Sequence, residues 1–240
     1  GYQQFKAKIA KTIRDGRKGF ATLERVKELT VRKKTLRLPA FAFSLSSHET
    51  QVTPKEGATL LRLLGPDAAL ISAYDAWKCS RDKDFHYTIK SLRESETVLF
   101  LDSGNYEAYR KNDHYSKKKN PNGWHKDHFR EMVARLSPDL AFSFDTINPK
   151  GEPDWIAARI AASFRADDRA LRERDFPLCP IIHLPSECEE PLASCAARIV
   201  SKVAAELDPI MLAIPERELG DGLLNRVRTV RDIRKALNDL

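Results

Sequence analysis

The feature that most constrains the fold is an alternation, repeated six times, between a short apolar segment and a longer charged or amphipathic one. An unbroken run of β-branched and aromatic residues with polar flanks is typical of a strand buried on both faces. Strict alternation of strands with helices favours a parallel sheet, because parallel strands need crossover connections. The sequence therefore predicts an α/β fold, with strands at residues 36–45, 68–74, 98–101, 140–144, 178–184 and 209–214.

The same βα units are short enough for a (β/α) barrel, which closes with eight strands over about 250 residues. Six units are visible in the 240 residues of this sequence. We therefore expect a TIM-barrel-like domain over residues 36–240 that lacks its last two βα units, with an open sheet as the alternative. Residues 1–35 are strongly basic and place Phe5, Ile9 and Ile13 four apart, which predicts a helical extension before that domain.

Composition and charge narrow the partners and the compartment. The formal net charge of +7 suits a polyanion such as a nucleic acid. No apolar run approaches the roughly 20 residues that cross a bilayer, so we expect no membrane partner. The four cysteines show no C-x-x-C spacing and no export signal is visible, which favours a reducing cytoplasm.

Polar clusters follow four of the expected strands at the point where each strand ends. They are residues 46–48, Asp75, residues 102–103 and residues 145–146. Parallel sheets and barrels bind their ligands at the carboxyl ends of the strands. We therefore expect Asp102 and Asp145 to face a common pocket. An aspartate at such a position also caps helices, and that interpretation stays open.

Two carboxylates beside an aromatic ring suit a heterocyclic base. One carboxylate can take or give a proton, while the other accepts hydrogen bonds from N–H groups of the ligand. Tyr106 follows Asp102 by four positions and offers a flat face on which a base can stack. These residue types therefore favour a purine-like ligand over a sugar or a fatty acid.

The motif D-S-G-N-Y at residues 102–106 resembles the D-S-G-G-[FY] signature of the tRNA-guanine transglycosylases (queuine tRNA-ribosyltransferases) and of their DNA-modifying relatives. Residues 38–54 are similar to that family's first strand and loop, and residues 70–74 to its second strand. Residues 137–145, S-P-D-L-A-F-S-F-D, resemble its D-x-x-M-x-F-D segment. The similarity covers about residues 36–150 in the family's order.

The resemblance implies an enzyme, a pentosyltransferase that replaces guanine in tRNA or DNA with a 7-deazaguanine derivative. It implies that Asp102 is the general acid/base and that Ser103 and Gly104 shape the turn beside the base. It further implies that Tyr106 stacks on the base and that Asp145 hydrogen-bonds its edge. Such an enzyme must expose its target base and hold the phosphate backbone with basic residues.

The sequence departs from the family's pattern at three points. Asn105 stands where the family has a second glycine. The family's covalent aspartate lies beyond the sixth strand, so no nucleophile is assigned here. The family's zinc site, three cysteines and a histidine, is absent, so no cofactor or metal is expected.

Two alternatives to the enzyme therefore stay open. One is a non-catalytic nucleic-acid or base-binding subunit, working with a partner chain or as a homodimer, and the other is a barrel enzyme acting on a small phosphorylated metabolite.

Histidines and cysteines outside the motif are weaker candidates. Three histidines could hold a metal ion, although solvated loop positions are the simpler interpretation: His114, His125 and His128. Cys188 and Cys195 lie seven residues apart, two helical turns, and are predicted to be small core residues. His183 ends the fifth expected strand, where it either faces the pocket or is a satisfied core histidine.

Overall fold

The structure is a computed structural model of the chain, and it describes residues 27–38, 40, 42–44, 52–114, 122–145, 149–171, 177–185 and 187–238. Internal contacts divide the chain into two compact units. The first comprises residues 26–147 and 163–180 and is called the sheet unit. The second comprises residues 1–25, 148–162 and 181–240 and is called the helical unit.

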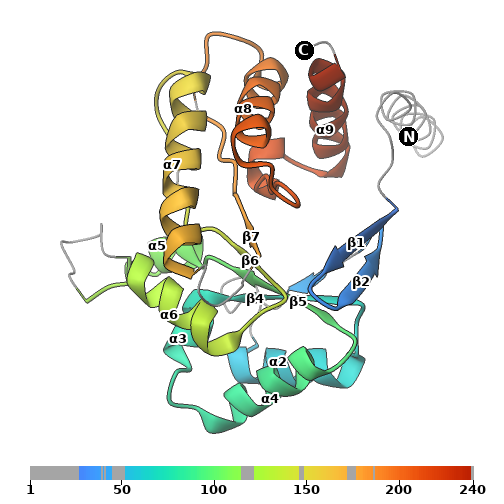
Figure 1. Cartoon of the computed structure of the whole chain (residues 1–240), viewed down its shortest axis with the longest axis vertical. Coiled ribbons are helices and arrows are strands. Elements are labelled where there is room, and N and C mark those ends of the chain that lie inside the picture. Colours follow the sequence, from blue (N-terminus) through green and yellow to red (C-terminus); the bar gives the residue numbers. More distant parts are fainter. Residues whose placement is uncertain are drawn as a thin grey trace, which may run out of the picture. The chain divides into compact units, whose positions relative to one another are not determined.

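The sheet unit is built on five parallel strands that lie side by side in chain order (Figure 1). The central strand β5 (Val98–Asp102) pairs with β4 and β6, so Val98–Leu101 is buried. The chain therefore has the expected α/β fold, and over the described residues the sheet is open, with β3 and β7 at its edges. The other strands are β3 (Ala42–Ser44), β4 (Ala68–Ser72), β6 (Leu140–Phe142) and β7 (Leu178–Cys179).

Local capping explains where the helices of the sheet unit begin and end. Helix α2 (Pro54–Leu64) starts with a capping box, in which the Thr53 side chain accepts from the Glu56 N–H and the Glu56 carboxylate accepts from the Thr53 N–H. It is capped at its C-terminal end by Gly65, whose backbone adopts the left-handed conformation. The remaining helices of this unit are α3 (Ala73–Lys78), α4 (Lys83–Glu94), α5 (Asn105–Arg110), α6 (Lys126–Leu136) and the second half of α7 (Pro153–Leu171).

The connection between β4 and β5 is formed by two helices, α3 and α4. The break comes at Asp82, whose carboxylate accepts from the N–H groups of Asp84 and Phe85 and so starts a new helix. Helix α4 buries Phe85, Ile89 and Leu92, spaced at three or four residues, against the core shared with α2 and the sheet.

An ion pair between a half-buried lysine and a buried aspartate links the hairpin to the start of the sheet. The Lys34 ammonium lies 2.8 Å from an Asp139 oxygen that also accepts from the Leu99 N–H at 2.8 Å. Lys34 belongs to a hairpin of β1 (Glu28–Val31) and β2 (Lys34–Arg37). The helical character expected over residues 1–35 is therefore wrong at residues 28–35, whereas residues 1–26 lie outside the described part of the chain.

The helical unit packs α8 (Leu192–Leu207) against α9 (Leu223–Asn238), with the first half of α7 and the short 3₁₀ helix η2 (Glu216–Leu219). Its core includes Ile156, Ile182, Ile199 and Ile233. The fifth and sixth expected strands meet here in one parallel bridge, Ile181 with Ala213.

The strand expected at 209–214 is therefore wrong as a regular strand, and the fifth is confined to β7 and this bridge. Proline, which cannot donate a ladder hydrogen bond, stands within or beside both segments, at positions 180, 185, 209 and 215. Among the described residues, every helix is too short or too polar to cross a membrane.

Candidate functional site

The candidate site lies in the sheet unit at the carboxyl ends of β5 and β6. Asp102 is the last residue of β5, and Asp145 follows β6 by three residues. The Ser103 hydroxyl donates a hydrogen bond to Asp145 Oδ1 at 2.7 Å. The structure therefore brings together the two strand ends that carry the predicted carboxylates. A pocket shared by both carboxylates stays a prediction.

Gly104 makes the turn between β5 and α5 possible. Its φ of 70° is left-handed, and its N–H donates to Asp102 Oδ2 at 3.1 Å. A Cβ at this position would lie 2.5 Å from both the Cβ and the backbone nitrogen of Tyr74, and 2.8 Å from Ser72 Oγ. The turn thus packs directly on the turn between β4 and α3, and glycine is required for both conformation and space.

Asn105 connects the turn to β6 and to a buried histidine. Its Nδ2 donates to the backbone carbonyl of Asp145 at 2.6 Å, and its Oδ1 lies 3.0 Å from His114 Nε2. Because a carbonyl can only accept, the amide nitrogen must face Asp145, so Oδ1 faces His114 and Nε2 must carry a proton. The amide thereby selects the imidazole tautomer. Asn105 is 1% exposed and His114 is 7% exposed.

Asn105 and His114 are site residues whose roles the sequence did not reveal. From the sequence, Asn105 was only a departure from a glycine pattern, and the simpler interpretation of His114 was a solvated loop histidine. The His114 ring instead stacks on Phe144, with centroids 6.3 Å apart and planes 16° apart. The signal that could have indicated these roles is Asn105 itself. It closely follows an apolar strand, and a polar side chain that is buried there needs hydrogen-bond partners.

A second polar group lies beside the turn, on α3 and after α5. Tyr74 donates to Asp113 Oδ2 at 2.9 Å, and Lys78 lies 2.7 Å from the same oxygen. Burial, followed by the hydrogen bond to Asp113, raises the pKa of Tyr74. Burial alone would raise the pKa of Asp113, but the hydrogen bonds from Lys78 and Tyr74 outweigh it and lower that pKa. Asp113 is therefore an ionised anchor.

Asp75 was expected at the end of a strand, but β4 ends earlier, at Ser72. Asp75 instead lies in the first turn of α3, where its N–H donates to Ser72 Oγ at 3.4 Å. It is 3% exposed, and the Lys111 ammonium lies 3.7 Å from its Oδ1. Asp75 thus joins α3 to Lys111, the residue that follows α5.

Tyr106 stands in the first turn of α5 and is half-buried. Arg110, one helical turn later, donates to the Tyr106 hydroxyl at 3.1 Å. The Arg110 guanidinium carbon also lies 5.6 Å from the centre of the Tyr106 ring. The ring is therefore oriented by a cation and carries a cation–π contact on a partly exposed helix.

The remaining candidates lie elsewhere. Residues 46–48 and Thr146 are outside the described residues. His125 caps α6 by accepting from the Asp127 N–H, and its ring stacks on His128 with centroids 3.9 Å apart. Burial, followed by the charge of His125, lowers the pKa of His128. Over the described part of the chain, these histidines belong to no group of three or more metal-ligand side chains.

Comparison with known proteins adds no family to this description. No protein-family profile matches the chain, and no curated protein sequence matches it significantly.

Proposed function

We propose that this protein is a base-exchanging pentosyltransferase that replaces guanine in tRNA or DNA with a 7-deazaguanine derivative. The observation that carries the proposal is the hydrogen bond from Ser103 to Asp145, which joins the D-S-G-N-Y turn to the end of the neighbouring strand. In this proposal the five parallel strands are part of a TIM-barrel-like domain whose ligand lies at the carboxyl ends of the strands.

The roles follow from what base exchange requires. When the bond between the base and C1′ of the ribose breaks, the leaving base gains a proton, and the incoming base must lose one. Asp102, fixed by the Gly104 N–H, exchanges that proton as the general acid/base. Asp145, oriented by Ser103, accepts hydrogen bonds from N–H groups on the edge of the base. Tyr106 supplies the stacking face. No nucleophile is assigned.

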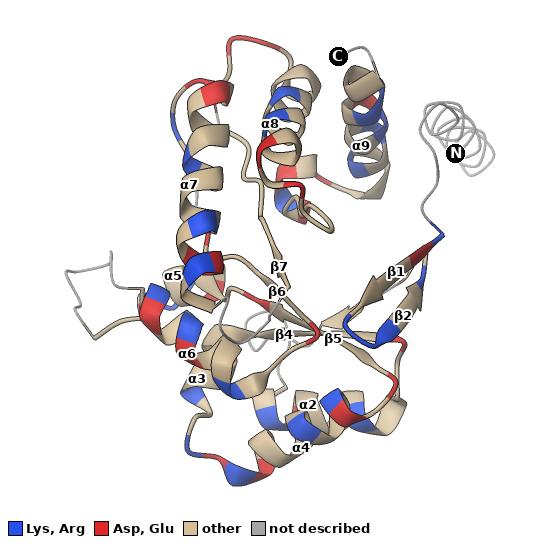
Figure 2. Ribbon diagram, viewed as in Figure 1, with Lys and Arg blue, Asp and Glu red and all other residues tan. Residues whose placement is uncertain are grey.

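The charge distribution supports a polyanionic partner. Helix α9 in the helical unit carries several basic side chains and one acidic residue, Asp232 (Figure 2). Its basic residues are Arg226, Arg228, Arg231, Arg234 and Lys235. Cations on one helix can follow a phosphate backbone. All four cysteines are free thiols, which supports the reducing cytoplasm expected for this activity.

One observation favours a second candidate, a non-catalytic subunit that binds a base or a nucleic acid. Asp102 accepts the Gly104 N–H in the manner of a turn-forming aspartate, which needs no chemistry. In this alternative the turn recognises a base without exchanging its proton. The two candidates differ in whether a base is covalently exchanged, so one assay separates them.

The test is incorporation of radiolabelled guanine into bulk tRNA and into duplex DNA, offered separately to the purified chain. We expect incorporation into one of them, and we expect Asp102→Asn to reduce the rate by about 100-fold or more, the usual contribution of a general acid/base. The control is Asp84→Asn, which removes an exposed carboxylate of α4 that pairs with Lys55. Unchanged exchange in Asp102→Asn would refute the role of Asp102.

Fluorescence anisotropy with labelled tRNA and labelled duplex DNA distinguishes the second candidate. Binding without exchange by the wild-type chain supports the subunit and contradicts the enzyme. Exchange by the wild-type chain contradicts the subunit. Absence of both binding and exchange refutes both candidates.

A further inference from the structure

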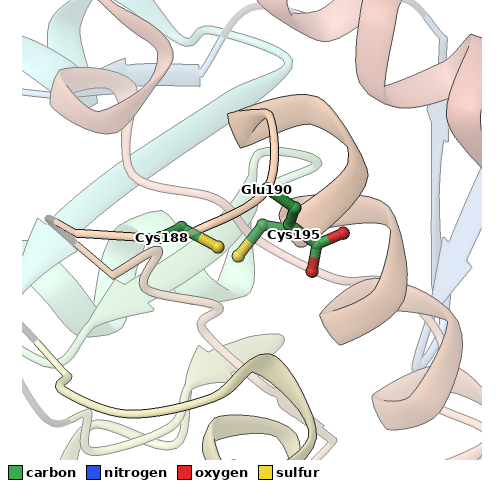
Figure 3. Close-up of side chains that lie close together, drawn as sticks. All are labelled: Cys188, Glu190 and Cys195. Atoms are coloured by element: carbon green, nitrogen blue, oxygen red, sulfur yellow. The ribbon is translucent and has the colours of Figure 1, made fainter.

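Two cysteines and a glutamate meet at the start of α8 in the helical unit. Their ligand atoms, the two sulfurs and a carboxylate oxygen, all lie within 4.8 Å of one another. Figure 3 shows the sulfur atoms of Cys188 and Cys195 pointing toward each other, with Glu190 beside Cys195. Both cysteines are free thiols, Cys195 buried and Cys188 half-buried. Over the described residues this is the one group of three or more side chains that could hold a metal ion.

The local backbone fixes this grouping. Pro191 is the N-cap of α8, and its carbonyl accepts from the Cys195 N–H at 3.0 Å in the first helical turn. Cys188 and Glu190 lie in the short segment just before that cap. The proline confines the helix to Leu192 onward, so Cys188 lies before the helix and can turn back toward Cys195.

The spacing matches a tetrahedral metal ion. With Zn–S bonds of about 2.3 Å, two thiolates on one zinc ion lie about 3.8 Å apart, and a thiolate and a carboxylate oxygen lie about 3.5 Å apart. Three ligand atoms within 4.8 Å therefore need only small side-chain rotations to reach these distances. Sulfur ligands select zinc and similar metals over magnesium or calcium, which prefer oxygen.

The surroundings hold the third ligand in place. Arg198 donates to Glu190 Oε1 at 2.7 Å, and another of its nitrogens lies 3.0 Å from Asp154 Oδ1. Metal-binding carboxylates are commonly oriented by such outer partners. Two thiolates and a carboxylate around a divalent ion leave one net negative charge, and the Arg198 guanidinium compensates that charge.

The group also has an entrance. A cavity of about 330 Å³ lies at the start of α7 and has Cys188 in its wall. The cavity is lined by residues 149–153 and 187–189. Three of its lining residues are acidic, Glu152, Glu187 and Glu189, and one is basic, Lys150. An acidic rim raises the local concentration of cations, so the cavity gives a metal ion a route to Cys188.

We propose that Cys188, Cys195 and Glu190 bind one zinc-class divalent cation, with a fourth position directed at this cavity. Metal binding requires the two thiols to lose their protons. Three protein ligands and one position for water or another small ligand are typical of an open zinc site. The site lies in the helical unit and is independent of the base-exchange proposal.

Cobalt(II) tests the site, because its bonds to thiolate absorb in the near ultraviolet and its tetrahedral complexes absorb in the visible. The full chain, kept reduced with a phosphine that does not bind metals, is titrated with Co²⁺ and then with Zn²⁺. We expect the thiolate-to-cobalt band to saturate at one equivalent and Zn²⁺ to abolish it. Cys188→Ser should lose the band. Glu190→Gln should keep the band but bind Co²⁺ at least roughly 10-fold more weakly.

Matched controls keep the experiment decisive. Cys79→Ser and Cys179→Ser remove the other two thiols, both in the sheet unit, and should leave the band unchanged. Circular dichroism verifies that Cys188→Ser, a substitution at a half-buried position, is folded. Absence of the band in the wild-type chain, or its persistence in folded Cys188→Ser, overturns the proposal. If the reduced chain binds no Co²⁺ and its subsequent oxidation removes two titratable thiols, Cys188 and Cys195 form a redox pair and the metal-site proposal is overturned.

Discussion

Replacing Gly104 with alanine tests the packing of the candidate site most directly. The added methyl group would meet the Cβ and backbone nitrogen of Tyr74 at 2.5 Å and Ser72 Oγ at 2.8 Å. Carbon atoms in contact are normally about 3.5–4.0 Å apart, so the overlap with the Tyr74 Cβ is about 1.0–1.5 Å by this measure. Two of the three contacted atoms belong to or adjoin the backbone at the start of α3, and no rotamer change can move them away.

The expected cost has two parts. A residue with a Cβ loses about 1–2 kcal/mol in the left-handed conformation that Gly104 adopts. Forcing a methylene-sized group into a packed interior costs about 1–3 kcal/mol more. The free energy of unfolding of the sheet unit should therefore fall by roughly 2–5 kcal/mol, a large part of the 5–15 kcal/mol typical of whole domains.

Gly65→Ala is the matched control. Gly65 also has a positive φ, 55°, but a Cβ there would meet nothing within 4 Å. Gly65→Ala should therefore show the conformational cost alone, about 1–2 kcal/mol. The difference between the two variants measures the steric cost at the turn.

Urea unfolding followed by tryptophan fluorescence is the assay. Trp77 and Trp124 lie in the sheet unit, with ring centroids 6.1 and 5.8 Å from that of Tyr74. A Trp155→Phe background removes the half-exposed tryptophan of the helical unit, so the signal reports the sheet unit alone. Equal losses of stability in Gly104→Ala and Gly65→Ala would refute the close packing of the two turns.

Two further predictions concern stability. Asp139→Ala should lower the free energy of unfolding by about 3–5 kcal/mol in the same assay, because it deprives Lys34 and the Leu99 N–H of a buried partner. Asp84→Ala, at an exposed position, should lower the free energy of unfolding far less. Similar losses in the two variants would contradict a structural role for the pair of Lys34 and Asp139. Because the folded-state pKa of His128 lies below its ordinary value, the unfolded chain binds the proton more readily, and stability should fall as pH drops below about 6.5. His128→Phe keeps an aromatic ring stacked on Trp77 and should reduce this dependence of stability on pH, measured by urea titrations between about pH 7 and pH 5. A residual dependence should remain from His86, because burial lowers the pKa of that histidine too. An unchanged dependence would exclude His128 as its source.

The parallel sheet was predictable because its central strands carry strong local signals. Residues 98–101 were expected as a strand, and β5 spans Val98–Asp102, since an unbroken apolar run fits a strand covered on both faces. The β4 and β6 strands follow from the same signal. Helices α6 and α9 were predictable from apolar residues at helical spacing, which bury one face against the core.

The hairpin of β1 and β2 gave no such signal. Its basic residues stand in the turn and in β2 rather than in β1, and the pairing buries Val31 and Leu36 in a stretch that otherwise looks like a solvated helix. The two-residue turn between the strands uses Arg32 at φ 55°, where asparagine or glycine is usual. The hairpin also depends on the bond from Lys34 to Asp139, 105 residues away, which no local pattern contains.

The two carboxylates of the candidate site differ in the same way. Asp102 is held by the amide of Gly104, two residues later, so the D-S-G spacing is enough to predict how that carboxylate is fixed. Asp145 is held by residues that follow β5, its side chain by Ser103 and its backbone by Asn105, across 42 and 40 residues. Those bonds exist because parallel pairing of β5 with β6 sets the two strand ends side by side. The sequence could therefore predict which strand ends lie side by side, but the buried amide that joins Asp145 to His114 appears only once the strands are paired.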